Sequence, residues 1–308
     1  MTAPTAAGRI ARTLIAAAAL AGAVALAPAA LARPGGLDAV IGPDGVTVTD
    51  DDRPVLFYRT KPAPGAEPGR SNYVHPLYAP DGTILTEDRP ADHPNQRGLF
   101  WAWRQVRLGD RIVADGWAMQ GLTYSVRKTN FGADRSGNGA AALTLEIDWI
   151  VNAGSELVYV ARETTKVRVQ PLRNGARRLD FDTLITANVD GLSLGGSDDA
   201  VGSGGFSARL IAPDRLIFHS GGRAVTAQQN ALTAGTSMGF AWPKQPGLEK
   251  WGVGLSCKAD GRPISQWVLR KEASMQNCVW PGRAPVALSK GRPLRLESTV
   301  VIKPAAGK

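Results

Sequence analysis

The fold is indicated most clearly by one stretch near the middle of the chain, Leu145-Glu146-Ile147-Asp148-Trp149-Ile150-Val151. Apolar and polar residues alternate along it, so that Leu145, Ile147, Trp149 and Val151 would share one face of an extended strand. This period of two predicts a half-buried strand of an antiparallel sheet.

The segments that follow repeat this pattern. Residues 157–169 form a long run rich in Val and Thr, which predicts one long strand or a bent pair. In residues 179–189, one face would carry Leu179, Phe181, Thr183, Ile185, Ala187 and Val189, opposite Asp180, Asp182 and Asn188. Three consecutive strands of this kind favour an antiparallel sheet with one face in the core.

Short apolar segments between turn signals run through the rest of the chain. The 35 glycines and 21 prolines are spread evenly, and Pro43-Asp44-Gly45, Pro80-Asp81-Gly82 and Asp260-Gly261 are typical of turns. We expect further strands at residues 46–50, 55–58, 83–85, 98–105, 122–128, 206–210, 216–218, 237–241, 251–257, 265–269 and 294–302. Many strands without a helical pattern predict an all-β protein, a large antiparallel two-sheet β-sandwich.

The first residues have the composition of a secretory signal. Arg9 and Arg12 precede an uncharged apolar run, residues 13–26, and Ala30-Leu31-Ala32 is a small-x-small cleavage site. The apolar run is shorter than the roughly 20 residues of a membrane-spanning helix, so the alternative of a membrane anchor is disfavoured. We therefore predict a signal peptide at residues 1–32, a single β-sandwich domain at 33–308 without a membrane span, and a periplasmic or secreted location.

The chain carries a moderate net positive charge, and its basic residues are scattered along the sequence. There are 36 Lys and Arg against 27 Asp and Glu, and the basic residues do not cluster in a run. A nucleic-acid-binding protein more often concentrates them on one element, so we expect no nucleic acid as partner. The excess of positive charge favours anionic ligands, such as acidic sugars.

Cys257 and Cys278 are the two cysteines of the chain. In an oxidising compartment they could form a disulfide if neighbouring strands bring them together, and the alternative is two buried free thiols. Two cysteines without a histidine cluster do not form a zinc site, and we expect neither a metal nor another cofactor.

The residues best suited to catalysis lie in a polar segment before the expected strand at 98–105. Asp92-His93-Pro94 should be a loop, because Pro94 disfavours helical geometry at His93. A loop histidine next to a carboxylate can act as an acid or base near neutral pH, and Arg97 offers a planar fork for substrate oxygens. We assign His93, Asp92 and Arg97 as candidate catalytic residues, with His75 as a weaker one. The alternative for both histidines is a hydrogen-bonded structural role.

The candidate substrate-binding residues are largely aromatic. Trp101 and Trp103 lie two apart on an expected strand, so their rings should point to the same face, where they could stack on a sugar or pack in the core. We add Tyr73, Arg104 and Trp117 to this predicted site. The motifs of serine hydrolases, zinc proteases and phosphate-binding loops are absent from the sequence.

These segments resemble a family of exported bacterial proteins of unknown function, the PmoA-like family, also called "methane oxygenase PmoA". The resemblance rests on ordered blocks that include His75-Pro76-Leu77-Tyr78, Asp92-His93-Pro94 with Arg97-Gly98, Phe100-Trp101-Ala102-Trp103, Gly204-Gly205-Phe206-Ser207 and Ser274-Met275-Gln276-Asn277. It implies an all-β sandwich related to the mutarotase-like supersandwich of carbohydrate enzymes, and a role in the use of sugars or glycosides. The oxygenase label does not suit this chain, since a copper enzyme of that kind needs membrane spans and clustered ligands.

The chain departs from the pattern of this family at several histidines. Asn95 and Gln96 occupy two positions that are usually histidine, and Arg104 occupies a third. If relatives use those histidines for metal binding or proton transfer, this chain has lost or changed that chemistry.

Three functions are compatible with these residues. The leading hypothesis is an exported carbohydrate-active enzyme that hydrolyses, eliminates or isomerises a sugar or modified glycoside, with His93 as acid or base. The alternatives are a non-catalytic sugar-binding module and a structural or interaction protein of the cell envelope. The sequence does not identify the sugar, the bond attacked or the oligomeric state.

Overall fold

The computed structural model of the chain describes residues 36–153, 156–272 and 274–305. The predicted signal peptide, residues 1–32, lies outside the described residues. The only helical element among those described is one turn of 3₁₀ helix, Pro213–Arg215, and the rest is strands and loops. The prediction of an all-β protein is confirmed.

The longest strands are β8 to β11 in the middle of the chain and β23 near its C-terminal end. Their bounds are β1 (Leu37–Ile41), β2 (Gly45–Asp50), β3 (Arg53–Arg59), β4 (Tyr73–Leu77), β5 (Leu99–Trp103), β6 (Gln105–Leu108), β7 (Arg111–Ala114), β8 (Leu122–Ala133), β9 (Ala141–Ala153), β10 (Glu156–Val169), β11 (Arg177–Ala187), β12 (Leu192–Gly195), β13 (Gly204–Ala208), β14 (Ile217–Ser220), β15 (Arg223–Val225), β16 (Leu232–Thr233), β17 (Ser237–Ala241), β18 (Trp251–Ala259), β19 (Arg262–Pro263), β20 (Gln266–Val268), β21 (Gln276–Val279), β22 (Val286–Ala287) and β23 (Leu294–Pro304).

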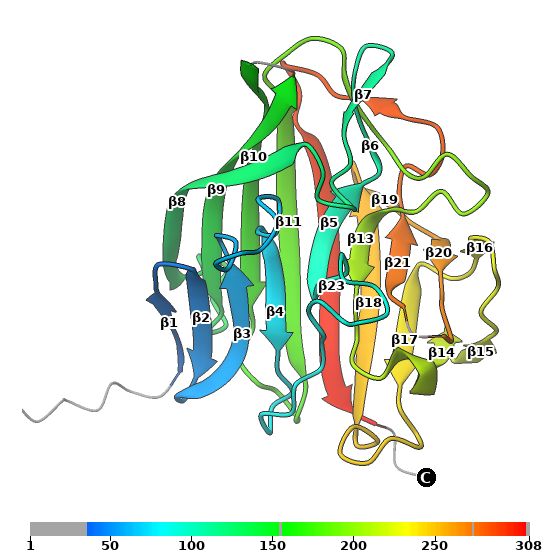
Figure 1. Ribbon diagram of the computed structural model, residues 1–308. Helices are drawn as coiled ribbons and strands as arrows, with labels where there is room; N and C mark the ends of the chain where they lie inside the picture. The colour runs from blue at the N-terminus through cyan, green and yellow to red at the C-terminus, as the bar shows by residue number, and fades with distance from the viewer. Residues whose placement is uncertain (1–35, 154–155, 273, 306–308) are drawn as a thin grey trace, which may run out of the picture. The chain divides into compact units, whose positions relative to one another are not determined.

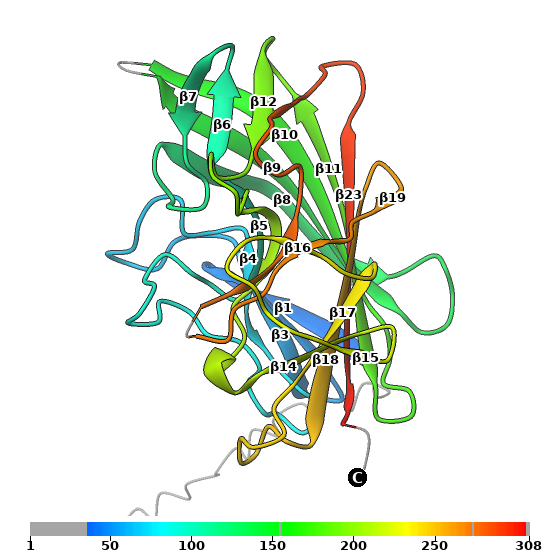
Figure 2. The same ribbon diagram turned by 90° about the vertical axis from the view of Figure 1, so that its right-hand side faces the viewer.

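Two large antiparallel sheets form the sandwich (Figure 1). The nine-stranded sheet has the order β1-β2-β3-β4-β5-β13-β21-β20-β16. The ten-stranded sheet has the order β15-β14-β17-β18-β23-β11-β10-β9-β8, with β19 paired to β18. A smaller four-stranded sheet, β22-β12-β6-β7, lies at one end of the sandwich, where β5 is followed by β6 (Figure 2).

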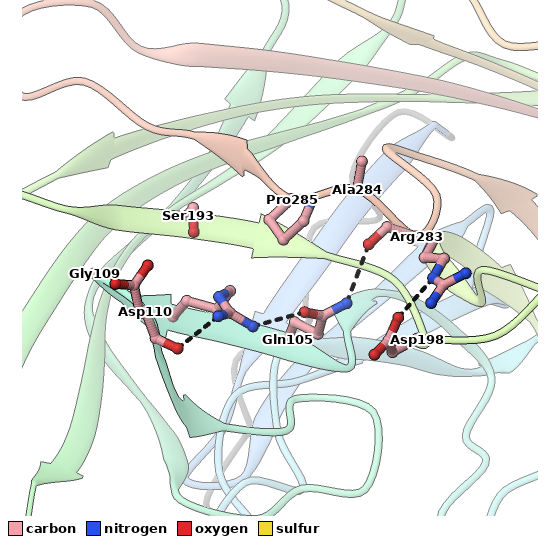
Figure 3. Close-up of a pocket in the computed structure, with 9 residues that line it drawn as sticks. Gln105, Gly109, Asp110, Ser193, Asp198, Arg283, Ala284 and Pro285 are labelled. Carbon is pink, nitrogen blue, oxygen red and sulfur yellow. Dashed lines mark hydrogen bonds and ion pairs between the residues drawn. The ribbon is translucent and has the colours of Figure 1, made fainter.

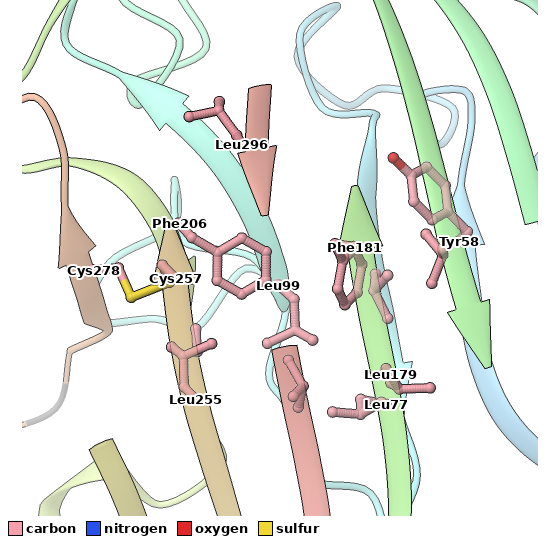
Figure 4. Close-up of a cluster of buried hydrophobic side chains, with 14 of the residues drawn as sticks. Tyr58, Leu77, Leu99, Leu179, Phe181, Phe206, Leu255, Cys257, Cys278 and Leu296 are labelled. Atoms are coloured by element: carbon pink, nitrogen blue, oxygen red, sulfur yellow. A yellow bond between two sulfur atoms is a disulfide. The ribbon is translucent and has the colours of Figure 1, made fainter. Parts of the chain in front are cut away.

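The core lies between the two large sheets and is continuous. Phe181 on β11 and Phe206 on β13 face each other from opposite sheets with ring centroids 5.5 Å apart (Figure 4). Cys257 on β18 and Cys278 on β21 form a disulfide that joins the sheets through this core. Of the two alternatives that the sequence left open for the cysteines, the structure has the disulfide.

The alternation that indicated the fold is reproduced in the structure. The residues predicted to share a face in 145–151 are buried, and residues 179, 181, 183, 185 and 187 are buried in the same way. Residues 145–151 lie within β9, residues 157–169 lie within β10, and β11 ends two residues before the predicted boundary at 189. The long strands were therefore predictable, because one side of each faces the core.

Two expectations about strands are wrong. The stretch 98–105 is not one strand: it is interrupted at Arg104, and β5 and β6 belong to different sheets. Residues 83–85 form no strand, although Ile84 makes an isolated bridge to Tyr78. The four-stranded sheet was not predicted, because its strands are too short to show a period.

Candidate functional site

The loops on the outer face of the nine-stranded sheet carry most of the predicted site residues. On this face, away from the main core, a second apolar cluster gathers Tyr73, Phe100, Ala102, Trp117, Val268, Met275 and Val279. Gly98 fixes the approach of β5 to β4, because a Cβ atom there would lie 1.8 Å from the carbonyl oxygen of Val74. The cluster explains why aromatic and polar residues are interleaved in this part of the sequence.

Arg97 is a structural residue beneath these loops. Its side chain is 1% exposed, and its guanidinium donates to the carbonyl oxygens of Asn95 (3.2 Å) and Gly116 (3.1 Å). It also lies over the ring of Phe100, 4.2 Å from the centroid. Burial lowers the pKa of Arg97 to about 10, so the group remains charged near neutral pH. The prediction that Arg97 holds a substrate oxygen is wrong, because the guanidinium is enclosed by protein.

His93 lies on the exposed surface of its loop. Its Nδ1 is 2.9 Å from Oδ2 of Asp92, and 46% of its side chain is exposed. Asp92 accepts two hydrogen bonds of 2.9 Å from the buried guanidinium of Arg209, which also pairs with Glu87 at 2.7 Å. Burial would raise the pKa of Asp92, but the hydrogen bonds from Arg209 and His93 outweigh it and lower the pKa to about 2. The predicted pairing of His93 with Asp92 is present, but the predicted cleft shared with Arg97 is not.

His75 and Tyr73 lie on β4 and are held by their neighbours. Nδ1 of His75 is 3.0 Å from the hydroxyl of Thr86, and burial lowers the pKa of this histidine. The hydroxyl of Tyr73 donates to Asp88 (2.8 Å), which also pairs with the buried Arg70 (2.7 Å). Tyr73 is 1% exposed and therefore cannot contact a substrate on the surface, which corrects its predicted role.

The tryptophans belong to the protein interior. Trp101 and Trp103 point to the same face, as predicted, with stacked rings 6.0 Å apart, but that face is the core. Trp103 donates its Nε1 hydrogen to the carbonyl of Trp280 (2.9 Å) and is 1% exposed. Trp117 is buried against Phe100. The prediction that Trp103 and Trp117 form walls for a sugar is therefore wrong.

Trp101 lines a small interior void with room for about one water molecule. Its Nε1 is buried and has no hydrogen-bond partner among the described residues. Glu163, on the opposite side of the void, accepts hydrogen bonds from Trp149 (2.7 Å), Thr165 (2.5 Å) and Asn72. Burial raises the pKa of Glu163 in spite of these donors. The void is too small for a sugar, so this cluster is a buried polar contact between the sheets.

An open hollow of about 440 Å³, here called the Arg270 hollow, lies beside the apolar cluster. It is lined by Arg104, Gln105, Ile112, Asp115, Ser197, Asp198, Asp199, Val201, Ser203 and Arg270. Arg104 is the one predicted site residue that lines it. The hollow has a volume in the range that is usual for small-molecule sites, and its lining is mostly polar and charged.

Arg104 is placed in the hollow by the loop that follows β7. Its guanidinium pairs with Asp115 (3.3 Å) and lies 5.8 Å from the ring centroid of Trp117. Asp115 also accepts from the backbone N–H of Ala118 (2.8 Å). Since Arg97 binds the carbonyl of Gly116, the buried arginine anchors the loop that holds Arg104.

Arg270 has no carboxylate partner within ion-pair distance among the described residues. Its side chain donates to the carbonyl oxygens of Gln228 (3.0 Å) and Leu269 (3.4 Å). Its backbone is fixed by Gln276, whose side chain bonds both the N–H and the C=O of Arg270. Partial burial is the main reason that the pKa of Arg270 is lowered, and the carboxylates of Glu272 and Asp199, beyond ion-pair distance, oppose this shift. An anionic ligand at the guanidinium would oppose it further.

The carboxylate of Asp199 stabilises the loop to which it belongs. Asp199 accepts from the hydroxyl of Ser197 (2.6 Å) and from the backbone N–H groups of Val201 and Gly202, both at 3.0 Å. The Ser197 hydrogen bond is the main reason that the pKa of Asp199 is lowered, so this group is ionised near neutral pH. Among the described residues no histidine lines the hollow. The hollow therefore offers charged and hydroxyl groups for binding.

A second hollow, here called the Arg107 hollow, adjoins the first and has a volume of about 600 Å³ (Figure 3). It is lined by Gln105, Arg107, Gly109, Asp110, Ser193, Asp198, Arg283, Ala284 and Pro285. Gln105 and Asp198 line both hollows. The strands and loops of the four-stranded sheet thus contribute to two adjoining openings next to the predicted site.

Sequence reasoning did not identify Arg270, Ser197 or Ser203. Arg270 is an isolated arginine after a strand, and nothing in its neighbours marks it. Asp198 and Asp199 are adjacent in the sequence, and Asp199 makes hydrogen bonds within its own loop, as turn residues commonly do.

Neither a metal site nor a membrane helix is found in the described ranges. No three of their His, Cys, Asp or Glu side chains are grouped so that they could hold a metal ion. No helix among these residues is long and apolar enough to cross a bilayer.

Comparisons with known proteins give a family match and distant similarities to solved structures. Residues 45–306 match the model of a family of unknown function, DUF6807. A search of curated proteins finds no match. The structure is similar to that of a candidate mutarotase (YeaD) from Salmonella typhimurium, with 9% identity, a TM-score of 0.35, and coverage of 88% of this chain and 92% of the other. The resemblance to PmoA-like proteins stays a prediction.

Proposed function

The chain belongs to DUF6807, a family of unknown function, and we propose that it is an exported protein that binds an anionic sugar in the Arg270 hollow. The observation that carries the proposal is the half-buried guanidinium of Arg270, which lines this hollow with only backbone carbonyls as hydrogen-bond partners. A carboxylate is the natural partner for such a group, because two parallel N–H donors fit its two oxygens.

The other groups of the hollow suit the hydroxyls of a sugar. Ser197 and Ser203 can donate or accept, the Gln105 amide and the Asp198 carboxylate can accept, and Arg104 supplies a second cation. Several hydroxyls on a ligand can bind the serine and aspartate side chains, and one carboxylate on it can bind the guanidinium of Arg270. The net positive charge of the chain would favour its approach.

Export is supported by two independent features. The N-terminal residues have the composition of a signal peptide. The Cys257–Cys278 disulfide is of a kind that persists in oxidising compartments and is rare in the cytosol. We infer a periplasmic or secreted location.

Binding is favoured over acid–base catalysis because the candidate base lies outside the hollow. His93 is exposed and paired with Asp92, and it lines neither hollow. Catalysis by His93 remains a second candidate only because its Nδ1 is oriented by a carboxylate, as in many catalytic histidines.

The test is isothermal titration of residues 33–308 with galacturonate, compared with galactose. We expect galacturonate to bind more tightly. Arg270→Gln and Arg104→Gln should each weaken that binding about 10- to 100-fold. Each variant loses a charge-assisted hydrogen bond, which contributes about 1.5–3 kcal/mol.

The matched control is Arg292→Gln, which removes one exposed arginine that lines neither hollow and should leave binding unchanged. Equal affinity for the acid and the neutral sugar, or full binding by Arg270→Gln, would contradict the proposal. Product analysis of wild type against His93→Ala tests the catalytic alternative.

A further inference from the structure

The Arg107 hollow has the same kind of lining as the Arg270 hollow. Each contains two arginines, and each has serine hydroxyls, aspartate carboxylates and the amide of Gln105 within its wall. Because Gln105 and Asp198 line both hollows, the two are neighbouring sections of one groove. Each section has a volume within the range of about 300–1,000 Å³ that is usual for small-molecule sites.

The floor between the two sections is rigid. Gln105 is buried, and its Nε2 donates to the carbonyl oxygens of Gly196 (2.7 Å) and Arg283 (3.2 Å). Gly195 packs so closely against this amide that an added Cβ would lie 3.2 Å from Nε2 and 3.0 Å from Pro285. A ligand would therefore meet a preformed floor, which reduces the entropy cost of binding.

The cations of the Arg107 hollow are held weakly and face the opening. Arg107 donates to Oε1 of Gln105 (3.0 Å) and to the carbonyl of Asp110 (2.5 Å), neither of which neutralises its charge. Arg283 pairs with Asp198 at 2.6 Å, but 68% and 73% of these side chains are exposed (Figure 3). An ion pair this exposed contributes little stability, so a ligand carboxylate can replace Asp198 at Arg283 at little cost.

We propose that the two hollows are two subsites of one groove, and that the ligand is an acidic oligosaccharide of at least two sugar units. One unit places its carboxylate at Arg104 and Arg270, and the next places its carboxylate at Arg107 and Arg283. The backbone of the oligosaccharide crosses above Gln105. This inference rests on the proposed function, since it assumes that the Arg270 hollow binds an anionic sugar.

The experiment compares galacturonate with digalacturonate and trigalacturonate in isothermal titrations of residues 33–308. We expect digalacturonate to bind at least tenfold more tightly than galacturonate, because it makes a second set of charge-assisted hydrogen bonds. Arg107→Gln should bring the affinity for digalacturonate close to that for galacturonate. Arg270→Gln should weaken the binding of all three ligands.

A second variant guards against a folding defect in Arg107→Gln. Ala284 is exposed and lines the Arg107 hollow but not the Arg270 hollow. Ala284→Trp should therefore obstruct the Arg107 subsite without disturbing the core. It should reduce the binding of digalacturonate more than that of galacturonate. Arg292→Gln again serves as the charge control.

The outcomes separate the two proposals. If galacturonate and digalacturonate bind with equal affinity, or if Arg107→Gln and Ala284→Trp both leave digalacturonate binding unchanged, the two-subsite inference is overturned and the proposed function stands. If none of the three ligands binds, the proposed function fails and this inference fails with it.

Discussion

Reduction of the Cys257–Cys278 disulfide should destabilise the protein by about 3 kcal/mol. The two cysteines are 21 residues apart, and chain-entropy theory gives about 3 kcal/mol for a loop of that length. The cross-link joins the segments that form β18 and β21. Without it, these two segments are no longer tethered to each other in the unfolded chain, which gains conformational entropy. For about 270 residues, with an unfolding entropy of about 2 cal/mol/K per residue, the expected fall in Tm is about 5–6 °C.

The measurement is urea unfolding of wild type, with and without a thiol reductant, followed by tryptophan fluorescence and far-UV circular dichroism. Oxidised and reduced wild type have the same core side chains, so their difference isolates the cross-link. The m-value should rise on reduction, because the unfolded state becomes less compact. The Cys257→Ala/Cys278→Ala double variant controls for other effects of the reductant and should show no response to it.

Two results would refute this reasoning. A stability loss below about 1 kcal/mol on complete reduction would mean that the cross-link does not restrict the unfolded chain. An unchanged m-value together with a large loss would instead place the effect in the folded state, as strain or repacking around Cys257 and Cys278.

The remaining predictions concern the buried charges and the core. The folded-state pKa of Asp92 is lowered to about 2, so its carboxylate stabilises wild type above about pH 4, and this stability is lost as the pH falls through about 2. Asp92→Asn should remove this stability. Superimposable acid unfolding curves for the two proteins would contradict the prediction. Glu163 has a raised folded-state pKa. Its contribution to the free energy of unfolding is therefore greatest at acid pH and declines as the pH rises through that pKa. Glu163→Gln should flatten this decline in urea titrations at several pH values, and an equally steep decline in the variant would show that another group causes it. Trp103→Leu should lower the free energy of unfolding by about 3 kcal/mol without changing the affinity for galacturonate at low temperature. A loss of affinity without a loss of stability would show that Trp103 contacts the ligand.

Much of the fold could be predicted from local sequence. The alternation in residues 145–151 and 179–187 is imposed by the pleat of a strand with one side in the core, and it needs no knowledge of the partner strand. The i, i+2 spacing of Trp101 and Trp103 likewise placed both rings on one face, as the structure has them.

The same spacing could not say which face was the core. Trp103 meets Trp149 of the opposite sheet, and this contact joins residues 46 positions apart in the chain. Arg97 was misassigned for a related reason: an arginine beside a histidine in a polar loop looks exposed, but here the loop folds over it and its carbonyl partners enclose it. Burial is decided by what packs on top, and that is a tertiary property.

The sequence by itself determined an all-β chain, because the periodicity of a strand is set by consecutive residues. Only the tertiary structure decided that Arg104, Arg270, Ser197 and Asp198 line one hollow, since these residues come from three different segments and meet only when the sheets and their loops have assembled. It also decided that Arg270 has no acidic partner within ion-pair distance among the described residues, because an ion pair depends on distances across the fold and not on the order of residues along the chain.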